Sequence, residues 1–112
     1  MDYRDFEVTS EVAGETYRVQ FRWLQTAISL RHSDTVDVKF QVNDGSKIVA
    51  IPHGALEHVC ARLKIPLTDE LCLRIAAEHL QHALATGEDA ERDLLTLTPS
   101  RVEDLGQLAQ AS

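Results

Sequence analysis

The sequence predicts an α+β fold, in which an antiparallel meander sheet of four to five strands over residues 5–52 packs against two to three C-terminal helices. Apolar and polar residues alternate through the first half, with turn-forming residues between the stretches, and the apolar spacing becomes helical after Pro52. With 112 residues, 44% of them hydrophobic, the chain is long enough for one core. We therefore expect a single domain over residues 1–112, frayed at residues 107–112.

Two stretches of the first half alternate clearly and predict half-buried strands. In residues 16–24 the alternation places four apolar side chains on one face and three polar ones on the other. The four are Tyr17, Val19, Phe21 and Trp23, and the three are Arg18, Gln20 and Arg22. Residues 36–42 repeat the pattern with Val36, Val38, Phe40 and Val42. Weaker strands are expected around Phe6 and Val8, over residues 27–31, and over residues 48–51. Turns are expected at Gly14, over residues 32–35 and over residues 43–46.

Three helices are expected after residue 52, over residues 54–64, 69–86 and 99–109. Thr68 is a good N-cap for the second helix, and Gly87 is its expected C-cap. The third begins either at Thr98-Pro99 or with a capping box formed by Ser100 and Glu103. Residues 88–93 are predicted to be a solvated loop, and residues 94–97 are either extended or helical.

The helix at residues 69–86 is apolar around most of its circumference, which predicts that most of it is covered. There are two alternatives for the segment that covers this helix. One is the C-terminal segment, through Val102, Leu105 and Leu108. The other is a second copy, which would contact Leu71, Ile75, His79 and His82. The sequence therefore favours a non-catalytic protein-interaction domain that forms a homodimer, with Leu71, Ile75, His79, His82, Val102 and Leu105 as the expected interface residues.

The alternative function is a small-molecule-binding or enzymatic domain, with a pocket between the sheet and the helices. His53, Cys60 or His79 would serve it. His53 precedes Gly54 at a strand-to-helix junction, where backbone N–H groups can bind an anion. His58 and Cys60 diverge by about 200° on a helix, so they do not form a pair. The sequence has no catalytic constellation, and an enzyme is the less favoured interpretation.

The best metal-binding pair is His79 with His82, which can share one face of a helix. Glu78 is close enough around the helix to join His82. No third and fourth ligands follow at a recognisable spacing, so two partly buried or interface histidines are the better interpretation. We predict no cofactor and no metal.

The charge balance argues against nucleic acid, because the formal net charge is −7 and no basic run is present. A patch of Arg18, Arg22, Arg31 and Lys39 is the remaining possibility. A base-stacking platform of Tyr17, Phe21 and Trp23 is disfavoured, since the arginines lie on the opposite face. We expect no membrane binding. Cys60 and Cys72 are interpreted as reduced core thiols in a cytoplasmic protein. The order of elements is common among small bacterial domains, and a fold alone does not give function.

Overall fold

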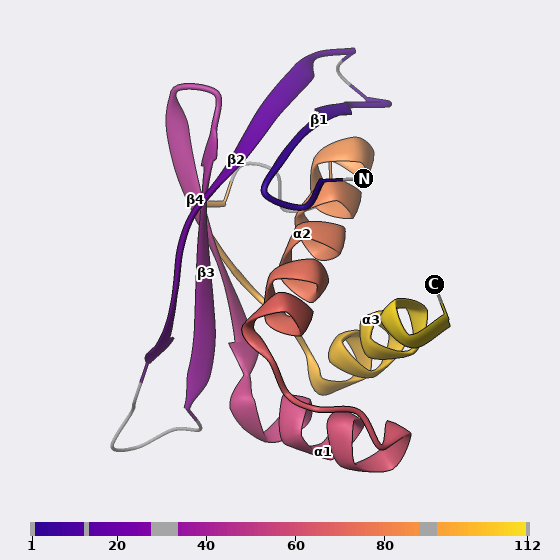
Figure 1. The fold of residues 1–112 in the computed structure, drawn as a ribbon. Helices are drawn as coiled ribbons and strands as arrows, with labels where there is room; N and C mark the ends of the chain where they lie inside the picture. Colours follow the sequence, from indigo (N-terminus) through magenta and orange to yellow (C-terminus); the bar gives the residue numbers. More distant parts are fainter. Residues whose placement is uncertain (1, 13, 28–33, 88–91, 112) are drawn as a thin grey trace.

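The computed structural model describes residues 2–12, 14–27, 34–87 and 92–111. An open five-stranded sheet forms one layer, and the helices lie together on one of its faces (Figure 1). The strands are β1 (Asp5–Thr9), β2 (Thr16–Ala27), β3 (Thr35–Val42), β4 (Gly45–Pro52) and β5 (Leu94–Thr96). The helices are α1 (His53–Leu63), α2 (Asp69–Thr86) and α3 (Pro99–Ala111). The predicted α+β class is confirmed.

The sheet has the order β1-β2-β3-β4-β5, and its first four strands form the expected antiparallel meander. Two turns confirm the sequence analysis, because Gly14 and Asn43 adopt positive φ angles of 71° and 52°. A separate third strand was expected at residues 27–31. Of these, Ala27 ends β2, and residues 28–31 lie outside the described part of the chain, as do residues 32 and 33 of the expected turn.

The observed fifth strand is β5, which pairs in parallel with β4. The extended alternative for residues 94–97 is therefore correct over Leu94–Thr96. The parallel pairing is a correction to the all-antiparallel expectation. It arises because β5 returns to the sheet edge after two helices, and a long crossover of this kind allows strands to run in the same direction.

The core lies between the sheet and the helices and is centred on Phe40, which is fully buried. Phe6 of β1 and Phe21 of β2 contact its ring edge-on, with ring centres 6.4 and 6.2 Å away. Such T-shaped pairs add to the burial of apolar area. The alternation predicted for β3 is confirmed, because Val36, Val38, Phe40 and Val42 are all buried.

The alternation predicted for β2 is wrong at Trp23. A β-bulge shifts the register between Phe21, which pairs with Phe40, and Trp23, which pairs with Lys39. One extra residue in a strand sends every later side chain to the opposite face. Trp23 consequently lies on the face away from the helices, where Lys39 Nζ is 5.8 Å from the centre of its ring. Leu24 takes the core-facing position opposite Val38.

Both ends of α2 and the start of α3 lie at the capping residues that the sequence predicted. Thr68 Oγ1 accepts a hydrogen bond from the Leu71 backbone N–H, and Gly87 closes α2 with φ of 81°. Thr98 Oγ1 accepts from the Arg101 backbone N–H, so α3 uses the Thr98-Pro99 start. This helix runs to Ala111, two residues further than expected, and Ser112 is outside the described residues. None of the helices within the described residues is both long and apolar enough to span a membrane.

Candidate functional site

The residues expected at an α2 interface are divided between the core and the surface. Ile75 and Val102 are fully buried and Leu105 is 5% exposed, all within one copy of the chain. Leu71 and His79 are half-buried, and His82 is exposed. The expected intramolecular contact is present in part, because α3 packs against α2 and buries Val102 and Leu105, whereas Leu108 is 52% exposed. Ile75, Val102 and Leu105 are not available for contact with a second copy in this fold.

The structure does not bring together the residues of the alternative hypothesis. His53 lies at the start of α1, where its Nδ1 is 2.6 Å from Glu57 Oε1. Cys60 is buried on the core side of the same helix, and His58 is exposed. His79 lies in the second half of α2. In the described part of the chain, no group of three His, Cys, Asp or Glu side chains could bind a metal ion.

The two thiols are held in their neutral form. Burial raises the pKa of Cys60 above its ordinary value. Burial also raises the pKa of Cys72, to about 11, and the nearby Asp69 and Cys60 add to this shift. Both cysteines are free and buried. A thiol of this kind is a poor nucleophile at neutral pH, because the thiolate is the reactive species.

His79 and His82 do share a site, but their neighbours there are arginines. A cavity of about 320 Å³ lies between the second half of α2, the segment around β5, and the start of α3. Its polar lining comes from His79, His82, Arg92, Thr96, Thr98 and Arg101. The sequence analysis did not find Arg92, Thr96, Thr98 or Arg101. These four lie within residues 92–101, and they line the cavity because β5 and α3 bring this stretch of chain beside α2.

Two contacts hold this cavity in shape. Arg101 Nε donates a hydrogen bond to His79 Nδ1 at 3.3 Å and so joins α3 to α2. Lys47 is buried on the core side of β4, opposite Phe40, and its Nζ donates to the Arg92 backbone carbonyl at 2.5 Å. A buried lysine needs such a partner. The contact anchors the backbone at Arg92 against the sheet.

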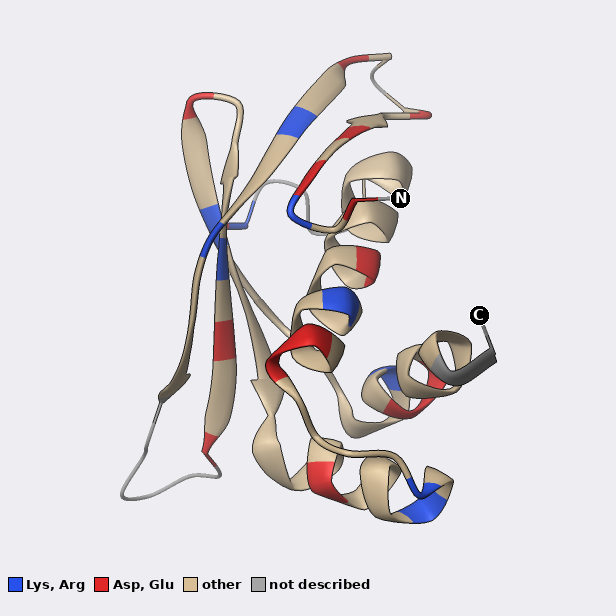
Figure 2. Cartoon of the chain, viewed as in Figure 1, with Lys and Arg blue, Asp and Glu red and all other residues tan. Residues whose placement is uncertain are grey.

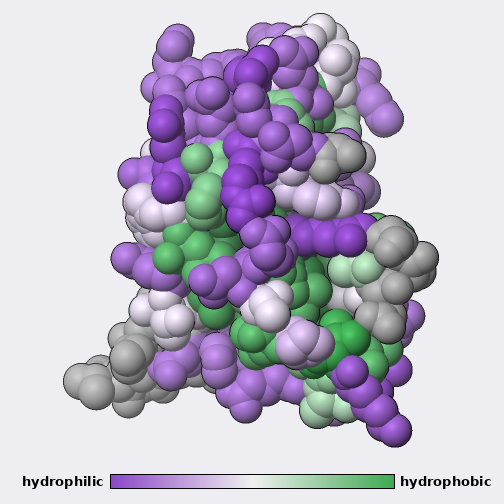
Figure 3. All heavy atoms as spheres, in the orientation of Figure 1, coloured by the Kyte–Doolittle hydropathy of each residue, from purple (hydrophilic) through white to green (hydrophobic). Residues whose placement is uncertain are grey.

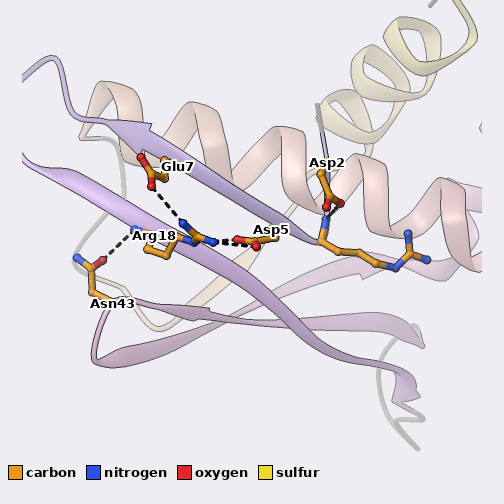
Figure 4. A network of polar contacts seen from close by, with 6 residues as sticks. Asp2, Asp5, Glu7, Arg18 and Asn43 are labelled. Carbon is orange, nitrogen blue, oxygen red and sulfur yellow. Dashed lines mark hydrogen bonds and ion pairs between the residues drawn. The ribbon is translucent and has the colours of Figure 1, made fainter.

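Two arginines of the expected basic patch, Arg18 and Arg22, already contact other residues of the chain. Arg18 forms ion pairs with Asp5 at 2.8 Å and with Glu7 at 3.2 Å, and its backbone N–H donates to Asn43 (Figure 4). Arg22 donates to Gln41, and Arg31 lies outside the described residues. Figure 2 shows basic and acidic residues interspersed over the sheet and the helices. This distribution gives no support to a surface that tracks phosphates.

One half of β2 is a sheet edge. β1 pairs with β2 only from Thr16 to Gln20, with a further bond from the Phe21 N–H to the Arg4 carbonyl. Residues 23–27 pair with β3 on one side and with no described strand on the other (Figure 1). Viewed from this side, hydrophobic residues reach the surface between the sheet and the helices (Figure 3). Leu24 of β2 and Leu71 of α2 are half-buried against the core.

Comparisons with protein-family models, with curated proteins and with solved structures found no match for this chain.

Proposed function

We propose that this chain is a non-catalytic cytoplasmic domain that works by self-association, and that two copies meet at the unpaired edge of β2. The proposal depends on one observation, the unpaired edge of β2. Within the described residues, no strand pairs with the outer side of residues 23–27, and these residues contain no charged side chain. Soluble proteins normally protect such an edge with charges, prolines or a covering element.

We expect the partner at this edge to be a second copy of the chain. The two β2 strands can pair antiparallel about a twofold axis, so that each supplies the same hydrogen-bond pattern to the other. The chain carries a net charge of −7, and two copies repel each other over most of their surface. The uncharged residues 23–27 offer a place where this repulsion is small. Leu24 and Leu71 would bury more apolar area there.

This contact surface differs from the one that the sequence favoured. Of the residues expected there, Leu71 is half-buried and remains accessible to a second copy, whereas Ile75, Val102 and Leu105 belong to the core. The buried thiols support a binding role over catalysis, because neither cysteine is activated. Two free cysteines also suit a reducing compartment such as the cytoplasm. The ion pairs of Arg18 support the expectation that nucleic acid is not the partner.

Light scattering coupled to size exclusion, at tens of micromolar protein, tests the proposal. The wild-type chain should have twice the monomer mass. Leu24→Lys and Leu71→Lys should both shift it to monomer, since a lysine can place its ammonium at the surface while opposing edge pairing. Leu94→Lys is the matched control, because Leu94 is 56% exposed at the other edge of the sheet. Circular dichroism checks folding of each variant. A monomeric wild-type chain contradicts the proposal.

A further inference from the structure

A depression of about 500 Å³ lies on the helix-free face of the sheet, beside the bulge of β2. Three segments line it. They are Arg22 and Trp23 of β2, Lys39 and Gln41 of β3, and Asp44, Gly45 and Ser46 at the turn into β4. Small-molecule pockets have volumes of roughly 300–1,000 Å³, so the depression has room for a small ligand.

The bulge of β2 creates this site. It turns Trp23 away from the core and places it opposite Lys39 of β3. Arg22 is the extra residue of the bulge, and its guanidinium donates a hydrogen bond to Gln41 Oε1 on the same strand as Lys39. Bulges are frequent next to binding sites because they redirect a side chain that a regular strand would point elsewhere. An aromatic ring and a guanidinium group therefore meet on the solvent face of the sheet.

The polar groups beside Trp23 include both donors and acceptors of hydrogen bonds. The Arg22 guanidinium and the Lys39 ammonium only donate, whereas the Asp44 carboxylate only accepts. The Ser46 hydroxyl does both. A ligand with several hydroxyl groups can use all four side chains, because each of its hydroxyls also donates and accepts. An anion, in contrast, would meet the Asp44 carboxylate.

The contacts that these side chains already make leave donors and acceptors for a ligand. Arg22 has five N–H groups, and its bond to Gln41 uses one of its nitrogens. Lys39 Nζ lies 5.8 Å from the centre of the Trp23 ring, and a cation–π contact at an exposed position is weak enough for a ligand to displace. The Asp44 side chain at the turn is exposed.

We propose that this depression binds a sugar, whose pyranose ring stacks on the indole of Trp23 and whose hydroxyl groups bond to Arg22, Asp44 and Ser46. The C–H groups on one face of a pyranose form a flat apolar surface, which gains by covering an aromatic ring. The hydroxyl groups project from the rim of the same ring, toward the polar side chains around Trp23. This function is independent of self-association, because it uses side chains on the face of the sheet and not the backbone at its edge.

Titration of the full chain with glucose, galactose and N-acetylglucosamine tests the proposal through the fluorescence of Trp23. At least one of the three sugars should change the emission saturably, since Trp23 is the single tryptophan of the chain. Sorbitol is the matched control, because it carries the same kind of hydroxyl groups on an open chain without a ring. A response that is absent with all three sugars, or that sorbitol reproduces, would overturn the proposal.

Two variants locate the site, with binding followed by NMR of the backbone amides. Trp23→Leu should abolish saturable binding, because it removes the stacking surface. Asp44→Ala should weaken binding about tenfold, the effect of losing one hydrogen bond to a charged group. Asp104→Ala is the control, since it removes the same charge from an exposed position of α3 and should leave the Kd unchanged. Wild-type affinity in either of the first two variants, or an equal loss in the control, would contradict the proposed site.

Melting temperatures separate misfolding from lost contacts. If Asp44→Ala disturbs the turn, Ser46→Ala supplies the second variant and should weaken binding about threefold, because a neutral hydrogen bond contributes less than a charged one. Light scattering distinguishes this test from that of self-association. Asp44→Ala should keep the oligomer mass of the wild type, and the monomeric Leu24→Lys variant should still bind the sugar.

Discussion

Gly106 of α3 lies directly against Val59 of α1. A Cβ atom at position 106 would be 2.9 Å from Val59 Cγ2. Real Cβ atoms essentially never approach a neighbour this closely, and both residues are buried. The missing side chain is therefore what lets the two helices pack at their observed separation.

Gly106→Ala should destabilise the fold although alanine is the better helix former. The propensity gain is about 1 kcal/mol, and overpacking a buried contact costs about 1–3 kcal/mol. We expect a net loss of about 1 kcal/mol in the free energy of unfolding, measured by urea denaturation. Gly54→Ala in α1 is the control, because nothing lies within 4 Å of its added Cβ. An equal gain in stability for both variants would contradict this packing.

Trp23 should behave as a tryptophan on the helix-free face of the sheet. It is the single tryptophan of the chain, so its fluorescence reports on this position alone. We expect red-shifted emission that iodide quenches efficiently, because Lys39 attracts the anion to within reach of the ring. The comparison is with acrylamide, which is uncharged, and with the Lys39→Gln variant, which should reduce the iodide effect. Blue-shifted emission that resists both quenchers would place Trp23 in the core and exclude the bulge.

Cys72 should be unreactive in the folded protein at pH 8. Its pKa of about 11 leaves little thiolate at that pH, and burial also blocks access. A thiol reagent should therefore modify Cys72 far more slowly than it does in denaturant. Rapid labelling of the native chain at pH 8 would show that the thiol is exposed and activated.

The same pKa makes the stability of the fold fall at high pH. The folded value lies above the ordinary value of 9.0, so Cys72 favours the folded state fully below pH 9. That contribution is lost as the pH rises through about 11, because unfolding then releases a proton. Cys72→Ala should show a smaller loss over this range in denaturant titrations. An identical pH dependence in the two proteins would contradict the raised pKa.

Thr68→Ala should destabilise α2 by about 1 kcal/mol, since it removes the side-chain acceptor for the Leu71 N–H. Thr68 is exposed, so no core contact is lost with it. Thr68→Asp is the control and should retain the wild-type stability, because a carboxylate caps a helix N-terminus as well as a hydroxyl does. Urea denaturation of the three proteins gives the comparison. Equal stability of Thr68→Ala and the wild type would mean that the cap contributes nothing.

The sequence determined the local structure because its causes are local. The period of the apolar residues defined β3 and α2, Thr68 and Gly87 marked the ends of α2, and turn residues such as Gly14 separated the strands. Each of these signals acts through neighbours within a few residues. The sequence also showed that α2 is apolar on most sides, so that most of its surface needs to be covered by other segments.

The tertiary structure decided everything that depends on which distant segments meet. It packed α3 against α2 and buried Ile75 within one copy of the chain, and it inserted the bulge that turns Trp23 away from the core. It brought His79 of α2, Arg101 of α3 and Arg92, which precedes β5, to one cavity. Spacing along a chain carries no information on such meetings, because they depend on how the layers pack and where a crossover returns to the sheet.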